Sequence, residues 1–260
     1  MTAKPRVLVL RAAGTNCDME TAFAFELAGA ESTVAHVNRL SDHSVRLSDF
    51  QILAIPGGFS YGDDVAAGKV FAVELEHRLG GELGEFVAGG GLAIGICNGF
   101  QVLVKTGILP GNDGFAPGEA ATLAANDSQK YEDRWVTLEV DETPCVWLPP
   151  DGRRIELPVA HGEGKFVPRS IEVLSALKEG RQIVLRYVRP DGGDAGYPEN
   201  PNGSVDGIAG ICDPTGRVIG LMPHPERYTC QRQHPRWTRG EGRDPGDGRA
   251  FFENAVKALA

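Results

Sequence analysis

The sequence predicts an α/β protein built on an open, mostly parallel sheet that is flanked by helices. The first observation is that apolar, β-branched segments at 6–10, 32–37 and 51–55 alternate with segments of helix-like composition, as parallel strands joined by crossover helices do. The second is that small-residue turns follow two apolar segments, at 56–63 and 95–99, as expected where strands end. Additional antiparallel strands are expected in the second half of the chain.

The individual elements follow from these patterns. In order, we expect a strand at 6–10, a helix at 19–28, strands at 32–37 and 51–55, a helical stretch at 68–87 and a strand that ends at Cys97. Short alternating segments then predict strands at 120–123, 135–140, 155–160, 182–188, 208–212 and 218–222, before a closing helix at 250–259. The segments 191–202 and 232–249 are rich in Gly and Pro and are expected to be loops.

Composition limits the functional classes. A chain of 260 residues fits one large domain spanning 1–260. The net charge of −9, without a dense Lys/Arg block, argues against binding to nucleic acid or anionic membranes. The five cysteines are scattered without a Cys-x-x-Cys pair, so we expect no metal site and a reducing cytoplasm. No apolar run is long enough for a signal peptide or a membrane span.

Cys97 is a candidate nucleophile because of its local sequence. The apolar run 92–94 leads into Gly95-Ile96-Cys97-Asn98-Gly99, and a second apolar run follows. This pattern predicts a tight strand-to-helix turn, where only small flanking residues avoid a clash. The free N–H groups at the start of the helix would favour the thiolate. A small buried cysteine at a strand end is the alternative that this pattern leaves open.

A catalytic thiol needs a base, and His161 and His224 are the two histidines to compare. His224 follows an apolar strand, and the proline after it favours an extended backbone. In an extended segment His224 and Glu226 would point the same way, so that the carboxylate fixes the tautomer while the other ring nitrogen faces the thiol. The alternative is a rigid turn whose histidine caps a local group.

Backbone N–H groups near the thiol could form an oxyanion hole. Gly57 and Gly58 follow a neighbouring strand, and Asn98 follows Cys97 directly. Both loops are expected at the carboxyl ends of parallel strands, where ligands bind in open α/β sheets. The simpler interpretation of Gly57-Gly58 is a tight turn between a strand and a helix.

These residues resemble those of the class I, triad-type glutamine amidotransferases, a flavodoxin-like family in which Gly-x-Cys-x-Gly carries the nucleophile and a later His-x-Glu completes a triad. More narrowly, the chain resembles the glutaminase subunits of phosphoribosylformylglycinamidine synthase. The matching segments extend over nearly the whole chain in the family's order and are 14–18, 56–64, 95–101, 161–164, 197–204 and 223–227.

The resemblance implies that L-glutamine is hydrolysed to glutamate and ammonia through a thioester on Cys97. His224 would act as base and then as acid, oriented by Glu226. Gln101, one helical turn after the nucleophile, would help to hold the amino-acid end of the substrate.

The segment 126–131, which includes Asn126 and Ser128, is similar to a family segment whose backbone helps to bind the α-amino and carboxylate groups of glutamine. No cofactor is implied for this chain, and it has no phosphate-loop motif.

The family also implies partners. A glutaminase of this kind works with a synthetase that consumes the ammonia, using ATP and Mg to convert formylglycinamide ribonucleotide to formylglycinamidine ribonucleotide in de novo purine biosynthesis. By resemblance, this chain is the free-standing form, which works with a separate synthetase subunit and a small accessory subunit.

Three alternatives remain at this point. The chain could be a glutaminase for another synthetase, a cysteine hydrolase of related α/β fold, or a degenerate amidotransferase that only binds or regulates. The two-residue His-x-Glu spacing argues against the hydrolase, and the presence of Cys97, His224 and Glu226 argues against the degenerate form.

Overall fold

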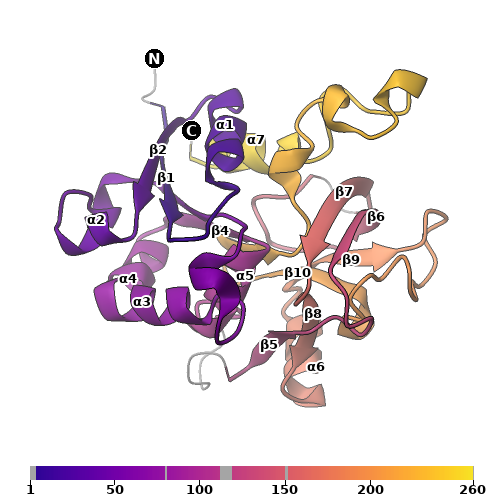
Figure 1. The fold of residues 1–260 in the computed structure, drawn as a ribbon, viewed down its shortest axis with the longest axis horizontal. Coiled ribbons are helices and arrows are strands. Elements are labelled where there is room, and N and C mark those ends of the chain that lie inside the picture. The colour runs from indigo at the N-terminus through magenta and orange to yellow at the C-terminus, as the bar shows by residue number, and fades with distance from the viewer. Residues whose placement is uncertain (1–3, 80, 112–118, 150–151, 260) are drawn as a thin grey trace.

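Nine strands form one sheet in the part of the chain that the computed structural model describes, which is 4–79, 81–111, 119–149 and 152–259 (Figure 1). In sheet order they are β2 (Glu31–His36), β1 (Arg6–Arg11), β3 (Ile52–Ile55), β4 (Leu92–Ile96), β11 (Val218–Leu221), β10 (Ile208–Cys212), β9 (Ile183–Val188), β6 (Glu132–Val140) and β7 (Arg154–His161). The first five strands are parallel and the later pairings are antiparallel. The predicted fold class is confirmed.

Helices cover both faces of the parallel half (Figure 1). One side carries α1 (Asp18–Leu27) and α7 (Arg249–Lys257), and the other carries α3 (Lys69–Leu79), α4 (Glu82–Ala88) and α5 (Asn98–Lys105). Phe25 of α1 and Phe252 of α7 meet edge to face, with ring centroids 4.9 Å apart. Because helices shield both faces, the central strands β3 and β4 are buried along their whole length, as their continuous apolar sequences require.

A smaller sheet packs against α5. It pairs β5 (Ala121–Ala124) with β8 (Lys165–Pro168) in antiparallel register. Phe100 of α5 stacks on Phe166 of β8, with ring centroids 6.3 Å apart. The hydrophobic core is continuous through both halves of the large sheet, which favours one domain over residues 1–260. Within the described ranges, no helix is long and apolar enough to cross a membrane.

The structure differs from the sequence-based expectation at several elements. The helical stretch predicted at 68–87 is two helices, and Gly81 caps the second; position 80 lies outside the described residues. The strand at 218–222 was expected to be antiparallel, but β11 is parallel to β4 and antiparallel only to β10. Alternating hydrophobicity indicates which side chains of a strand face the core, but not whether the strand pairs in parallel or antiparallel direction. The expected direction of the strand at 218–222 was wrong for this reason.

Three short elements were missed by the sequence analysis. They are α2 (Asn38–Ser41), β8 and α6 (Ile171–Glu179). The start of α6 does carry a signal, because the Ser170 hydroxyl accepts a hydrogen bond from the amide of Val173 at 3.4 Å, as an N-cap residue does. The loop expected at 232–249 is largely irregular and includes the short 3-10 turns Gln231–Gln233 and Trp237–Arg239.

We predict that Gly99→Ala destabilises the fold by about 3 kcal/mol. A Cβ atom at Gly99 would lie 1.8 Å from the backbone oxygen of Ile55, so α5 and β3 would have to separate. Gly84→Ala is the matched control, because a Cβ atom there meets nothing within 4 Å in α4, and alanine should stabilise that helix by about 0.5–1 kcal/mol. Urea unfolding measures both; equal midpoints for Gly99→Ala and the parent protein would contradict the prediction.

Candidate active site

Four parallel strands end side by side at one edge of the large sheet. They are β1, β3, β4 and β11, which are neighbours in that order. The parallel direction of β11 places the segment after it next to the end of β4, where the amide of Cys97 donates to the oxygen of Leu221 at 2.8 Å. Ligands of open α/β sheets bind at this edge. The segments that follow the four strands therefore define the candidate site.

Cys97 sits on the predicted strand-to-helix turn. It follows β4, precedes α5, and has φ 52° and ψ −105°, a conformation rarely found outside glycine. A Cβ atom at Gly95 would lie 2.5 Å from the oxygen of Gly99. Close backbone packing thus requires glycine at positions 95 and 99. The predicted tight strand-to-helix turn is confirmed. The thiol is buried and lies 3.6 Å from the backbone oxygen of Ala160, which accepts its weak hydrogen bond.

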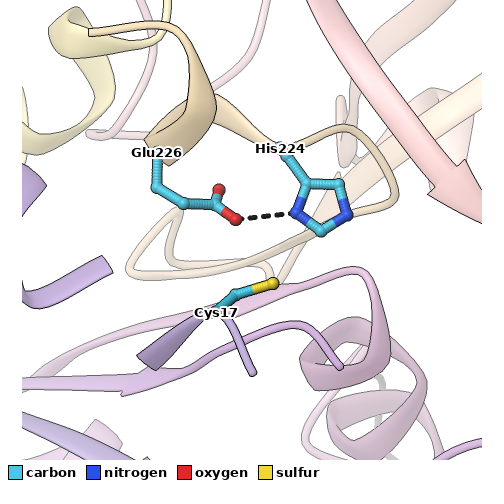
Figure 2. A group of neighbouring side chains, drawn as sticks. All are labelled: Cys17, His224 and Glu226. Carbon is cyan, nitrogen blue, oxygen red and sulfur yellow. Dashed lines mark hydrogen bonds and ion pairs between the residues drawn. The ribbon is translucent and has the colours of Figure 1, made fainter. Parts of the chain in front are cut away.

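His224 and Glu226 form a buried pair. The Nδ1 atom of His224 lies 2.7 Å from Oε1 of Glu226, and both side chains are at most 2% exposed (Figure 2). The contact was predicted, but the conformational reason given for it is wrong. Glu226 lies in the 3-10 turn Pro225–Arg227 rather than in an extended segment. Pro225 begins this turn, where its missing N–H costs nothing.

The imidazole of His224 is close to Cys97. A Cβ atom at Gly57 would lie 2.8 Å from Cε1 of His224 and 3.4 Å from Cβ of Cys97, so both side chains border this glycine. Burial by itself would lower the pKa of His224, but the charges of Glu226 and Cys97 raise it well above the usual value. The Nε2 atom is buried and has no hydrogen-bond partner among the described residues. The site thus combines a thiol with an imidazole suited to hold a proton.

Gly57 borders Cys97, Gly58 follows Gly57 in the chain, and Asn98 follows Cys97 directly. The oxygen of Gly57 accepts hydrogen bonds from the amides of Asn16 at 3.4 Å and Cys17 at 3.3 Å, which fix the orientation of this peptide. Gly58 has φ +142°, and a Cβ atom there would lie 2.7 Å from the Asn16 nitrogen. The amide of Asn98 is in the first turn of α5, where the helix offers no acceptor. The oxyanion-hole assignment remains a proposal.

The side chains of the three residues expected to bind substrate form hydrogen bonds within the protein. Gln101 is buried; its Oε1 accepts from Asn98 at 3.0 Å, and its Nε2 donates to the oxygen of Glu163. The side-chain Nδ2 atom of Asn126 donates to the backbone oxygens of Lys130 at 2.9 Å and His161 at 2.8 Å.

The Ser128 hydroxyl accepts from the amide of Lys130 at 3.3 Å. The side chains of Gln101 and Asn126 therefore tie loops together, and their role toward glutamine stays a prediction.

Cys17 is the residue that sequence reasoning missed. Its sulfur accepts a hydrogen bond from Nη2 of Arg227 at 3.0 Å and donates to Oδ1 of Asn16 at 3.2 Å. It also lies beside His224 and Glu226 (Figure 2). Burial raises the pKa of this thiol. The available signal was its place after the first strand, since that strand ends at the same edge of the sheet as β4.

His161 has a different role from His224. It lies at the end of β7, is 3% exposed, and its Nδ1 atom is 3.2 Å from Oδ1 of Asn126. A Cβ atom at Gly164 would lie 2.5 Å from this ring. Burial, and then the charge of His224, lower the pKa of His161 to about 3. The imidazole is therefore neutral at ordinary pH and is part of the packing beneath the site.

A known family matches nearly the whole chain. Residues 4–258 match the model of the CobB/CobQ-like glutamine amidotransferase domain. The chain belongs to this family. The phosphoribosylformylglycinamidine synthase subunit PurQ of Dehalococcoides mccartyi is 48% identical over 98% of this chain and 98% of that protein. The PurQ protein of Archaeoglobus fulgidus is 40% identical over 98% of this chain and 97% of that protein.

Solved structures agree with this assignment. A chain in the structure of PurLQS from Thermotoga maritima is 31% identical, with a TM-score of 0.76, and the match covers 99% of this chain and 100% of that one. A glutamine amidotransferase from Methylobacillus flagellatus is 15% identical with a TM-score of 0.54, over 100% of this chain and 96% of that one, which shows a shared fold. The resemblance predicted from the motifs is confirmed, and the protein is a glutamine amidotransferase.

His161 should make the fold sensitive to acid. Its pKa is about 3 in the folded protein against 6.5 for an ordinary histidine, so between these values the unfolded chain binds one proton more. Stability should therefore fall as pH falls below about 6.5, by up to about 1.4 kcal/mol per pH unit from this group.

His161→Gln should show a shallower decline in urea unfolding measured between about pH 7 and about pH 4. His77→Gln, at an exposed position of α3, is the control and should follow the parent protein. The same slope for His161→Gln and the parent would show that His161 is not the buried neutral group.

Proposed function

We propose that the chain is the glutaminase component of phosphoribosylformylglycinamidine synthase in the cytoplasm. It hydrolyses L-glutamine and passes the ammonia to a separate synthetase subunit, which uses ATP and Mg to convert formylglycinamide ribonucleotide to formylglycinamidine ribonucleotide. A small accessory subunit is part of the proposed complex. The support is the identity of 48% to a PurQ subunit over nearly the whole chain, joined to the arrangement of Cys97, His224 and Glu226 at one sheet edge.

The first half of the reaction forms a thioester. His224 takes the proton of the Cys97 thiol, and the sulfur attacks the side-chain carbonyl carbon of glutamine. The oxygen becomes negative in the tetrahedral intermediate and accepts hydrogen bonds from backbone N–H groups of the Gly57-Gly58 segment and Asn98. When the intermediate collapses, the imidazolium gives its proton to the leaving nitrogen, and ammonia departs.

The second half returns the free enzyme. His224 takes a proton from water, and the hydroxide attacks the thioester carbon. The C–S bond then breaks, glutamate leaves, and the proton returns to the sulfur of Cys97. Throughout, Glu226 keeps the imidazole in one orientation through the 2.7 Å contact with Nδ1 and stabilises its charged form.

The α-amino and carboxylate groups of glutamine are assigned to the neighbourhood of Gln101, Asn126 and Ser128. Because the side chains of Gln101 and Asn126 already hold partners, the contact to glutamine is proposed to come from backbone groups of the 126–131 segment. Asn126 would act by fixing that segment to the His161 backbone.

Cys97→Ala should abolish glutamine-dependent synthesis by the assembled complex, whereas synthesis from added ammonium should persist. The thiol forms the proposed covalent bond to glutamine, and ammonium bypasses that step. The measurement compares product formation with each nitrogen donor. Retention of glutamine-dependent turnover by Cys97→Ala would overturn the nucleophile assignment, and failure with both donors would point to a broken complex, which co-purification with the synthetase subunit would reveal.

His224→Ala should lower kcat/KM for glutamine by about 10²–10⁴, and Glu226→Gln should cause a smaller loss. Because the charge of Glu226 raises the pKa of His224, its removal lowers that pKa. The acidic limb of the pH profile for glutamine turnover should then move to lower pH in Glu226→Gln. An unchanged profile together with reduced activity would assign Glu226 a packing role only.

A further inference from the structure

Cys17, His224 and Glu226 form a compact set of three different ligand types. One ligand atom from each residue, a sulfur, a ring nitrogen and a carboxylate oxygen, lies within 4.8 Å of the other two (Figure 2). All three side chains are buried. The residues come from the segment after β1 and the segment after β11, so no spacing motif in the sequence reveals the set.

We propose that this set binds a thiophilic divalent cation with tetrahedral preference, of which Zn²⁺ is the example, and that the bound ion switches glutamine hydrolysis off. The binding is independent of the proposed function, whereas the inhibition depends on it. Cys17 has no part in the reaction described above, so a substitution of Cys17 can remove the ion site while His224 and Glu226 stay in place.

The chemistry of the ligands fits such an ion. Thiolate, imidazole and carboxylate are the ligands of zinc in proteins, with bonds of about 2.0–2.3 Å, which places tetrahedral ligand atoms roughly 3.3–3.6 Å apart. The observed upper separation of 4.8 Å closes to this range with side-chain movements of about 1 Å. A thiolate and a carboxylate together balance the charge of a divalent cation.

An unsatisfied oxygen in the set points the same way. The Oε2 atom of Glu226 is buried and lacks a hydrogen-bond partner among the described residues. A buried polar atom of this kind is costly unless a partner is supplied. Because Nδ1 of His224 faces Glu226, the ion would bind the ring through Nδ1, and the 2.7 Å contact between Nδ1 and Oε1 would be replaced by bonds from both residues to the ion.

Arg227 and Glu20 form an outer layer beside the sulfur of Cys17. Arg227 donates from Nη2 to the sulfur of Cys17 at 3.0 Å and from Nε to Glu20 at 2.8 Å. Groups that orient a metal ligand commonly lie in such an outer layer. On binding, the Cys17 thiol and the imidazolium form of His224 each release one proton to solvent. Cys17 gives up its 3.2 Å hydrogen bond to Asn16, while the sulfur still accepts from Arg227.

Occupation of the set would stop the proposed reaction. When Nδ1 of His224 binds the ion, the neutral ring carries its proton on Nε2, so Nε2 cannot receive the proton of Cys97. The carboxylate of Glu226 then no longer orients a free imidazole. Removal of the ion by a chelator frees the imidazole of His224 and the carboxylate of Glu226, so the inhibition should be reversible.

The binding test uses Co²⁺ as a spectroscopic substitute for Zn²⁺ in Cys97→Ser protein, which cannot bind the ion through the proposed nucleophile. We expect a thiolate-to-cobalt charge-transfer band that Zn²⁺ abolishes by competition. The band should be absent when Cys17→Ser is added and present when Cys230→Ser is added as the matched control. Absence of the band in Cys97→Ser protein, or its survival after Cys17→Ser, would overturn the proposed site.

The inhibition test uses the complex with its synthetase subunit in chelator-buffered Zn²⁺. Glutamine hydrolysis by the parent protein should be inhibited and should recover with excess chelator. Relative to its own rate without Zn²⁺, Cys17→Ser should need at least ~10-fold more free Zn²⁺ for the same fractional inhibition. Equal sensitivity of Cys17→Ser and the parent would overturn the switch. A failed glutaminase function would instead leave no activity to inhibit, while the Co²⁺ result would be unaffected.

Discussion

The constrained backbone at Cys97 is the feature on which the rest of the site depends. With φ 52° and ψ −105°, this residue ends β4 and begins α5 in a single step. Such a conformation costs of order 1–3 kcal/mol and persists only where the surrounding structure determines it. Here the determining contacts are backbone packing of Gly95 against Gly99 and of Gly99 against β3. The thiol is thereby presented at the sheet edge together with the first amides of α5.

A second constraint fixes the groups that face the thiol. The segment after β1 holds the oxygen of Gly57 through two amides, and it also places the Cys17 sulfur against Arg227 and His224. The turn at Pro225–Arg227 holds Glu226 against His224 without solvent access. Because parallel strands β1, β3, β4 and β11 are neighbours, four segments far apart in the sequence can share one small volume.

Much of this arrangement was predictable, and the remainder failed for identifiable reasons. The strand expected at 208–212 has those bounds in the structure, and the elbow at Cys97 follows from glycines whose packing role is local. The direction of β11 was not predictable, because alternation does not encode pairing direction. The contact of His224 with Glu226 was expected from an extended chain, yet it arises from a turn begun by Pro225. The approach of Cys17 to His224 depends on two loop conformations, which no periodic pattern encodes.

The central claim is that Cys97 carries the glutamyl group during turnover. The most direct measurement is acid quenching of the assembled complex while it consumes glutamine, followed by mass-spectrometric mapping of the acylated peptide. The account predicts a γ-glutamyl group on the peptide that contains Cys97 and none on the peptide that contains Cys17. A glutamyl group on Cys17, or sustained turnover by a protein in which Cys97 is never acylated, would contradict it.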